Sequence, residues 1–314
     1  MMSFLEIKDL KVHYPIRGGF FNTIQDYVYA VDGISMKIEE GKTYGLIGES
    51  GSGKSTIGKA IVGLEKITSG QIFYKGQDVT RPRSRKKTNY NKDIQMIFQD
   101  SMSSLDPKKR VIDIIAEPIR NYEGLDKDKE KRRVFDLLEI VGLPKDAIYK
   151  YPFEFSGGQR QRIGVARAVA CKPRLIIADE PVSALDLSVQ AQVLNYMKEI
   201  QKALQLSYIF ISHDLGVVKH MCDYINIMHR GRFVETGDRE EIYQNPQHIY
   251  TKRLIAAIPE IDPANRDKLR EHRIKEEIEF ENKEKDYYDE KGKVYDLIQH
   301  EGTHFVAGKK EVTV

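Results

Sequence analysis

Short apolar runs separated by helical patterns dominate the first two thirds of the chain. Residues 43–47 form an apolar run that predicts a strand, and residues 55–64 directly after it predict a helix. Residues 94–98 and 207–212 also read as strands. Residues 175–178 form a run of the kind that a fully buried parallel strand shows. Strands that alternate with helices favour an α/β domain.

Helical periodicity takes over between about residues 100 and 170. Apolar residues there recur at helix spacing, at Val134, Leu137, Leu138 and Val141. A further amphipathic helix is expected after Asp186. Its apolar face carries Val189, Val193, Leu194, Met197, Ile200 and Leu204.

Turn residues and charge divide the rest of the chain. Residues 70–76 predict a short strand between turns, and residues 224–234 predict a hairpin that turns at Arg230-Gly231. From Asp262 onward charged residues of both signs alternate and the apolar fraction falls. We therefore expect a domain over residues 1–260, followed by a charged C-terminal extension over residues 261–314 that forms an appended tail.

A glycine-rich motif joins the strand 43–47 to the helix 55–64, and it fits the phosphate-binding-loop pattern G-x-x-x-x-G-K-[ST] in the context that this pattern requires. Glycines let backbone N–H groups turn toward phosphates, Lys54 reaches the β- and γ-phosphates, and the Ser55 hydroxyl can ligate Mg²⁺. Thr56, at the start of the predicted helix, is expected to cap that helix or to pack against its neighbours. A turn without a ligand is the alternative, and both flanks argue against it. The residues assigned to the nucleotide site are Gly48, Ser50, Gly51, Ser52, Gly53, Lys54, Ser55 and Thr56.

Two carboxylates, Asp179 and Glu180, follow the buried run 175–178. A carboxylate at this position can hold the Mg²⁺ shell, and an adjacent one can orient or deprotonate the attacking water. Alone, the pair is also typical of a helix start. Together with the phosphate-binding loop, it assigns Asp179 to the metal and Glu180 to catalysis.

A second anion site is predicted at Ser156-Gly157-Gly158-Gln159, because residues 160–170 read as a helix whose N-terminus would present free N–H groups. A simple helix cap is the alternative. With Ser183-Ala184-Leu185-Asp186 following the two carboxylates, the chain resembles the ATP-binding-cassette (ABC) ATPases. In that family the signature serine and glycines contact the γ-phosphate of ATP held by the opposite subunit of a head-to-tail dimer. Phe155 replaces the usual leucine of that signature.

The resemblance implies a fold class and further site residues. The fold is α/β, a P-loop NTPase (RecA-like) core with an antiparallel β subdomain, a helical subdomain at about residues 100–165 and a C-terminal extension. Gln99 matches the glutamine that touches Mg²⁺ and water, and His213 matches the histidine that contacts the γ-phosphate. Tyr14 matches the aromatic residue that stacks on adenine, and Asp186 matches an aspartate at the dimer seam.

Composition agrees with an enzyme of a reducing compartment. The chain has 314 residues, of which 40% are hydrophobic, enough to bury a sizeable core. It has no run of eighteen apolar residues, and its N-terminus lacks the features of a secretory signal. Two cysteines, Cys171 and Cys222, imply no disulfide framework. A net charge of +3 is weak, and the basic run 81–87 is more simply a solvated loop than a nucleic-acid site.

A closer resemblance, over nearly the whole chain, is to the ATP-binding subunits of bacterial oligopeptide/dipeptide importers. It rests on the segments 14–21, 30–33, 98–100, 104–107 and 245–254. Such a subunit uses ATP and Mg²⁺. Some relatives bind an iron–sulfur cluster through cysteines near the C-terminus, and we predict none here because no cysteine follows Cys222.

The same resemblance implies partners and a location. They are a second ABC ATPase subunit, with a heterodimer favoured and a homodimer as the alternative, two membrane permeases and, indirectly, an extracytoplasmic peptide-binding protein. This subunit is expected to be peripheral on the cytoplasmic face of the cell membrane. The permease is expected to contact residues 99–107 and the helix that follows, with Met102 and Leu105 at the contact. Alternatives are an ATPase of a related dipeptide, nickel or other small-solute importer, or a soluble ABC ATPase uncoupled from transport. DNA-repair members carry a long coiled coil and ribosomal ones a second cassette, which this chain lacks, and a P-loop kinase would not account for residues 156–159.

Overall fold

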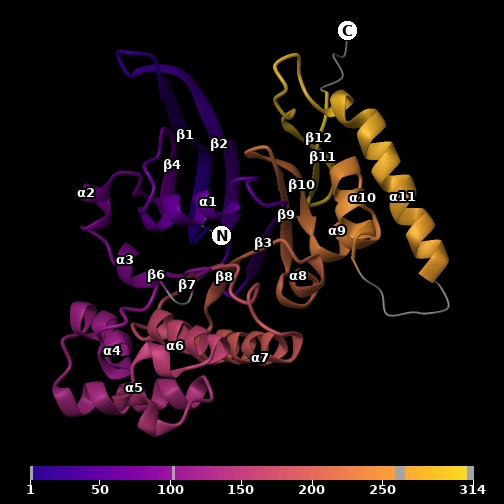
Figure 1. Cartoon of the computed structure of the whole chain (residues 1–314). Coiled ribbons are helices and arrows are strands. Elements are labelled where there is room, and N and C mark those ends of the chain that lie inside the picture. The colour runs from indigo at the N-terminus through magenta and orange to yellow at the C-terminus, as the bar shows by residue number, and fades with distance from the viewer. Residues whose placement is uncertain (1–2, 101–102, 259–265, 310–314) are drawn as a thin grey trace. The chain divides into compact units, whose positions relative to one another are not determined.

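The computed structural model describes residues 3–100, 103–258 and 266–309 (Figure 1). It divides into two compact units, which are described separately. The first comprises Met1–Glu6, Lys37–Lys42 and Phe73–Ile211; the second comprises Ile7–Met36, Thr43–Ile72 and Ser212–Val314.

A parallel sheet forms the centre of the first unit. Strand β7 (Leu175–Asp179) pairs in parallel with β6 (Ile94–Ile97) on one side and with β8 (Ser207–Ser212) on the other. Every residue of β7 and β8 is buried, as expected for parallel strands covered on both faces. Short elements lead into β6: β5 (Gln77–Asp78), which pairs with the end of β4 (Ser69–Tyr74), then α2 (Pro82–Arg85) and α3 (Tyr90–Asp93).

A group of helices makes up most of the rest of this unit. Helix α4 (Val111–Tyr122) packs against α5 (Lys127–Ile140) and α6 (Gly157–Val169), with the 3₁₀ turns η1 (Lys145–Tyr149) and η2 (Pro152–Glu154) between the last two. Helix α7 (Leu187–Leu204) buries Val193, Met197 and Ile200, whereas Leu204 at its end is exposed. The helical periodicity predicted both regions, and α6 begins three residues earlier than expected, because Ser156 caps it.

The second unit holds a long hairpin and a mixed sheet. Strands β1 (Leu5–Gly18) and β2 (Thr23–Ile38) form the hairpin, most of which belongs to this unit. Strand β3 (Thr43–Ile47) precedes α1 (Lys54–Val62) and pairs in parallel with β9 (Tyr224–His229). Strand β10 (Arg232–Asp238) returns antiparallel to β9, which confirms the predicted hairpin with its turn at Arg230-Gly231. Helices α8 (Leu215–Met221) and α9 (Arg239–Gln244) flank these strands in sequence.

The charged C-terminal segment, expected as an appended extension, contains helices and strands. Helix α11 (Arg266–Lys283) packs along α10 (Ile249–Ala256), as Figure 1 shows, and the turn η3 (Glu284–Tyr287) follows it. Strands β11 (Leu297–Glu301) and β12 (His304–Ala307) pair with each other, and β12 adds to the edge of β10.

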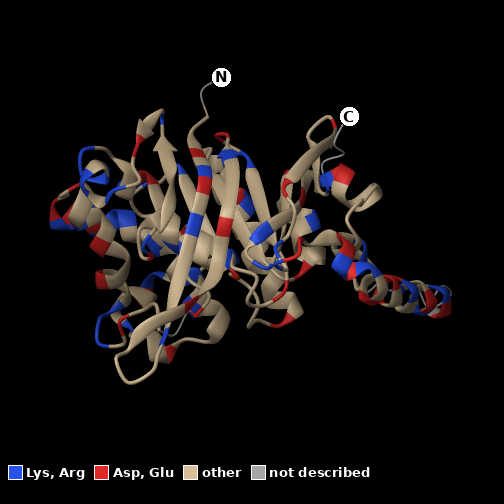
Figure 2. Ribbon diagram, turned by 90° about the horizontal axis from the view of Figure 1, so that it is seen from above, with Lys and Arg blue, Asp and Glu red and all other residues tan. Residues whose placement is uncertain are grey.

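Buried pairs that join distant residues explain why this segment folds. His304 Nε2 lies 2.6 Å from Glu235 Oε1 in β10, and neither side chain is more than 2% exposed. Phe280 of α11 and Tyr288 are also buried. Much of α11 carries acidic and basic residues side by side along its length (Figure 2), so most of its surface favours water. Among the described residues, no helix is long and apolar enough to cross a membrane.

Candidate functional site

The phosphate-binding loop connects β3 to α1 in the second unit, and Lys54 holds its shape. The ammonium group of Lys54 donates to the carbonyl oxygens of Gly48 and Glu49, each at 2.8 Å, and lies 3.4 Å from Ser52 Oγ. Lys54 is only 4% exposed, so its charge is balanced by these inward-pointing oxygens. The loop is therefore curled around the lysine, as a phosphate cradle requires.

Neighbouring backbone leaves no room for side chains at two loop glycines. A Cβ at Gly48 would collide with the carbonyl oxygen of Met228, and one at Gly53 would collide with that of Ala30. Gly53 also has a φ of +107°, which disfavours any other residue. Gly51 has a φ of +81° but faces open space. The loop is thus walled by backbone from β9 and from the hairpin.

Tyr14 of β1 lies beside the helix that follows the loop. Partial burial raises the pKa of its hydroxyl, a hydrogen bond to Glu65 raises it further, and a hydrogen bond to Thr56 acts in the opposite direction. Tyr14 is 37% exposed, so its side chain is accessible to solvent. This places an accessible aromatic side chain next to Thr56 of the predicted nucleotide site.

The two carboxylates of the first unit stand at the end of β7 with different environments. Asp179 is 2% exposed, whereas Glu180 is partly exposed. The backbone of Glu180 has a φ of +44°, which is costly for a residue with a side chain and marks a position that the surrounding structure holds in place. Its amide donates to the carbonyl of Ile211 at 3.0 Å.

Gln99 and Glu180, predicted from segments far apart in the sequence, meet in the structure. Gln99 Nε2 donates to Glu180 Oε2 at 2.8 Å. Because β6 and β7 are parallel neighbours, their carboxyl ends lie at the same edge of the sheet. A carboxylate and an amide at this edge can together orient a water molecule.

The signature residues begin helix α6, and the structure shows a capping box there. Ser156 Oγ accepts from the amide of Gln159 at 3.3 Å, and Gln159 Oε1 accepts from the amide of Ser156 at 3.0 Å. Gly157 has ordinary space around it, whereas a Cβ at Gly158 would collide with Val189 of α7. Gly158 is thus required by helix packing, a reason that the motif alone does not reveal.

His213 and Asp186 both lie exposed in loops. His213 follows β8 directly, and the next residue, Asp214, caps α8 by accepting from Gly216 N at 2.8 Å. Asp186 stands immediately before α7 in the first unit. Both positions agree with the loop locations expected from the sequence.

Two residues near the loop were not predicted from the sequence, Tyr250 and Arg253 of α10. The amide of Glu49 donates to the Tyr250 hydroxyl at 3.0 Å, and an Arg253 guanidinium nitrogen lies 3.2 Å from Glu49 Oε1. Both belong to the segment 245–254, one of those that carry the closer resemblance. The sequence thus pointed to the segment 245–254, but nothing in it placed that segment beside the phosphate-binding loop.

Comparisons with known proteins agree with this geometry. A family model described as ABC transporter matches residues 31–183, and one described as oligopeptide/dipeptide transporter, C-terminal region, matches residues 234–296. The chain is 61% identical to the oligopeptide transport ATP-binding protein OppF of Lactococcus lactis, over 98% of this chain and 96% of that relative. The chain belongs to the oligopeptide transport ATP-binding proteins, a family of ABC ATPases. It is also 52% identical to OppF of Bacillus subtilis, over 82% of this chain and 83% of that relative.

Solved ABC cassettes share the fold. CbiO1 from Clostridium perfringens, part of the ABC transporter complex cbiONQ, superposes with a TM-score of 0.67 at 25% identity, covering 81% of this chain and 96% of its own. The cassette MJ0796 in a dimeric post-hydrolysis state bound to ADP and Pi also gives 0.67 at 25% identity, covering 75% and 98%. These similarities confirm the predicted α/β fold and ATPase activity of this family member.

The region expected to contact the permease needs one correction. Leu105 is fully buried, and Arg167 Nη1 of α6 donates to the carbonyl of the preceding residue, Ser104, at 2.5 Å. A charged residue at position 105 would therefore disrupt packing rather than test a surface. Met102 lies outside the described residues.

The walls of the loop predict different tolerances at two glycines. Gly51→Ala should lower the free energy of unfolding by about 1–2 kcal/mol, which is the penalty for a side chain on a left-handed backbone, since the space around Gly51 is open. Gly53→Ala should cost more, because it adds the collision with Ala30, and should abolish ATP binding. Urea unfolding and ATP titration of both variants test this. Equal losses of stability and of ATP affinity in the two variants would contradict the proposed role of the Ala30 carbonyl as a wall of the loop.

Proposed function

We propose that this chain is the ATP-hydrolysing subunit that powers import of oligopeptides through a membrane ABC permease. The observation that carries the peptide assignment is the identity of 61% to a named oligopeptide transport ATP-binding protein over nearly the whole chain. The match of residues 234–296 to the C-terminal region of oligopeptide/dipeptide transporters supports it. The meeting of Gln99 and Glu180 supports the hydrolytic part.

In the proposed chemistry, Glu180 accepts the proton of the attacking water and Gln99 orients that water. The left-handed backbone of Glu180 supports this role, since strain at one carboxylate is typical of functional positions. Lys54 and the loop amides bind the β- and γ-phosphates, His213 contacts the γ-phosphate and Tyr14 stacks on adenine. The site mainly positions water and stabilises charge on the transferring phosphoryl group.

The residues proposed for the metal fit Mg²⁺ by their donor chemistry. Ser55 offers a hydroxyl, Asp179 a buried carboxylate and Gln99 an amide oxygen, which are the hard oxygen ligands that Mg²⁺ prefers. When bound, Mg²⁺ would neutralise charge on the phosphates. The place of Asp179 at the end of a fully buried strand supports this role.

We further propose that each ATP is shared between two chains. The signature segment from Ser156 to Gln159, with Asp186, would face ATP held by the phosphate-binding loop of a second ABC subunit, as a heterodimer. The exposed Ser156 hydroxyl at the N-terminus of α6 is suited to a phosphate, because that helix end carries free N–H groups. The dimeric structure of the MJ0796 cassette bound to ADP and Pi supports such pairing.

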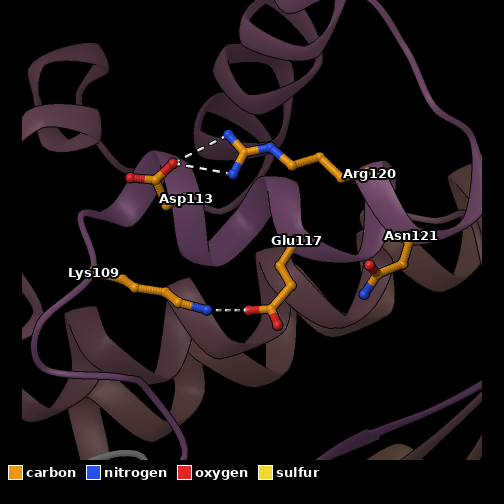
Figure 3. Close-up of a pocket in the computed structure, with 5 residues that line it drawn as sticks. All are labelled: Lys109, Asp113, Glu117, Arg120 and Asn121. Carbon is orange, nitrogen blue, oxygen red and sulfur yellow. Dashed lines mark hydrogen bonds and ion pairs between the residues drawn. The ribbon is translucent and has the colours of Figure 1, made fainter.

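Two permeases, and indirectly an extracytoplasmic binding protein, complete the proposed transporter at the cytoplasmic face of the membrane, where this subunit would be peripheral. The proposed permease contact is the loop after Gln99 and helix α4. This helix carries a pocket of about 290 Å³ whose lining residues are shown in Figure 3: Lys109, Asp113, Glu117, Arg120 and Asn121. Lys109 pairs with Glu117 at 3.1 Å, and Arg120 pairs with Asp113 at 3.1 Å.

Peptide uptake by proteoliposomes that contain the permeases, both ATPases and the binding protein tests the proposed function. Labelled oligopeptide should accumulate only with ATP. Glu180→Gln should bind ATP normally but hydrolyse it at least ~100-fold more slowly, because the base is lost. Near-normal turnover would remove Glu180 from the role of base, and ATP hydrolysis without peptide uptake would refute peptide import.

Mixing two inactive variants tests the shared site. Lys54→Ala and Ser156→Arg should each be inactive alone. If the chain pairs with itself, an equal mixture should regain about one quarter of wild-type activity, since half of the dimers are mixed and one of their two sites is intact. Full activity of either variant alone would contradict the shared site.

Charge reversal on α4 tests the permease contact. Glu117→Lys should lower peptide uptake roughly threefold or more by disturbing a charged interface, while leaving ATP affinity unchanged. The control is Glu139→Lys, an exposed position on α5 of the same unit. Unchanged uptake with Glu117→Lys, or an equal loss with Glu139→Lys, would rule out this face.

A further inference from the structure

Helix α11 is connected to the phosphate-binding loop through the side chain of Arg253. Arg253 of α10 donates from Nε to Glu277 Oε2 of α11 at 2.9 Å, and its Nη2 lies 3.2 Å from Glu49 Oε1 of the loop. The guanidinium also stacks on Phe280 of α11, 4.6 Å from the ring centroid. The planar, multi-donor guanidinium suits such a bridge between two carboxylates.

A cluster of buried aromatic rings supports the same connection between α11 and the loop. Tyr250, which accepts from the amide of Glu49, is fully buried. Its ring lies 4.2 Å from that of His229 and 5.9 Å from that of Phe280. His229 directly follows Met228, whose carbonyl walls the loop at Gly48. Phe280 therefore packs on Tyr250, which accepts from the Glu49 amide, and its ring centroid lies 6.4 Å from that of His229, the neighbour of Met228.

Burial keeps this aromatic group uncharged at neutral pH. It raises the pKa of the Tyr250 hydroxyl to about 12 and, with Arg230 and Arg253 adding to the effect, lowers the pKa of His229 to about 4. The facing charged groups are Glu49, Arg253, Arg230 and Glu284. The charges in this contact are thus carried by Glu49 and Arg253, and not by the ring groups.

The position of Glu49 makes its pairing consequential for ATP. Its carboxylate stands within a loop that is shaped to hold phosphates, and like charges repel strongly at short range. Arg253 compensates this charge and holds the side chain toward α10. Glu277, in turn, fixes the guanidinium from the other side.

We propose that Arg253 is a positioning residue through which α11 sets the affinity of the phosphate-binding loop for ATP. The chain of contacts runs from Glu277 to Arg253 to Glu49, with Phe280 and Tyr250 as its packed support. Whatever moves or binds α11 then changes ATP affinity without touching the nucleotide. This proposal rests on the ATP site of the proposed function and does not depend on peptide import.

The test measures ATP affinity of the full chain by competition with a fluorescent ATP analogue. Arg253→Met should raise the dissociation constant of ATP about five- to tenfold, and Glu277→Gln about two- to fivefold, as expected for partly exposed ion pairs. Glu279→Gln is the matched control, since this α11 carboxylate pairs with Lys283 of its own helix, and it should change affinity less than about twofold. In the assembled transporter, KM for ATP should rise while kcat stays unchanged.

A double-mutant cycle with Glu49→Gln separates positioning from general stability. Once Glu49 is neutral, Glu277→Gln should lose most of its effect on ATP affinity. The proposal is overturned if Glu277→Gln changes affinity no more than Glu279→Gln does, or if its effect persists undiminished beside Glu49→Gln. If Arg253→Met does not fold, the comparison of the two glutamates still decides. Failure of the unaltered chain to bind ATP would instead refute the proposed function.

Discussion

The close approach of backbone to the phosphate-binding loop is the constraint on which the second unit is built. The carbonyl oxygens of Ala30 and Met228 occupy the space that side chains at Gly53 and Gly48 would need. The amide of Gly231 donates to the carbonyl of Ser52 at 3.0 Å, so the β9–β10 turn is fastened to the loop as well. A loop enclosed in this way is formed before ATP arrives, which avoids an ordering cost on binding.

The catalytic edge of the first unit uses a different device. The buried parallel strands β6 and β7 end at the same edge of the sheet. Asp179 is the last residue of β7, and the left-handed backbone at Glu180 turns the next carboxylate in a different direction. The bond from Gln99 then ties the direction of Glu180 to the loop after β6. Helix α4, the proposed permease contact, follows Gln99 along the chain, so this hydrogen bond joins that part of the chain to the proposed base.

The sequence was informative where chemistry and burial leave local patterns. Residues 43–47 and 207–212 were predicted as strands with the bounds that the structure has, because fully buried strands are mostly apolar. The contacts of Gly158 with Val189, and of Arg253 with Glu49, join residues far apart and leave no periodic trace. Leu105 shows the same limit: one apolar residue in a loop has no neighbours in sequence that tell core from surface.

Charge composition did not reveal the fold of the C-terminal segment. A helix with many charged residues resembles a solvated tail, and the side chains that anchor α11 include Phe280 and Glu277. Strand β12 is held by its antiparallel pairing with β10 and by the buried pair of His304 and Glu235. Such long-range pairs decide whether a polar segment folds. They depend on residues of β10, which lie far from this segment in the sequence.

The central claim, that the phosphate-binding loop is a preformed cradle, is tested most directly by amide hydrogen exchange of the nucleotide-free chain, resolved to single residues. The amides of Glu49, Ser52 and Gly231 donate to the Tyr250 hydroxyl and to the carbonyls of Glu49 and Ser52, respectively. All three should exchange far more slowly than in an unfolded chain, because each requires an opening of the structure. Exchange at unfolded rates that slows only when ATP is added would show that the nucleotide forms the cradle, and would contradict the account.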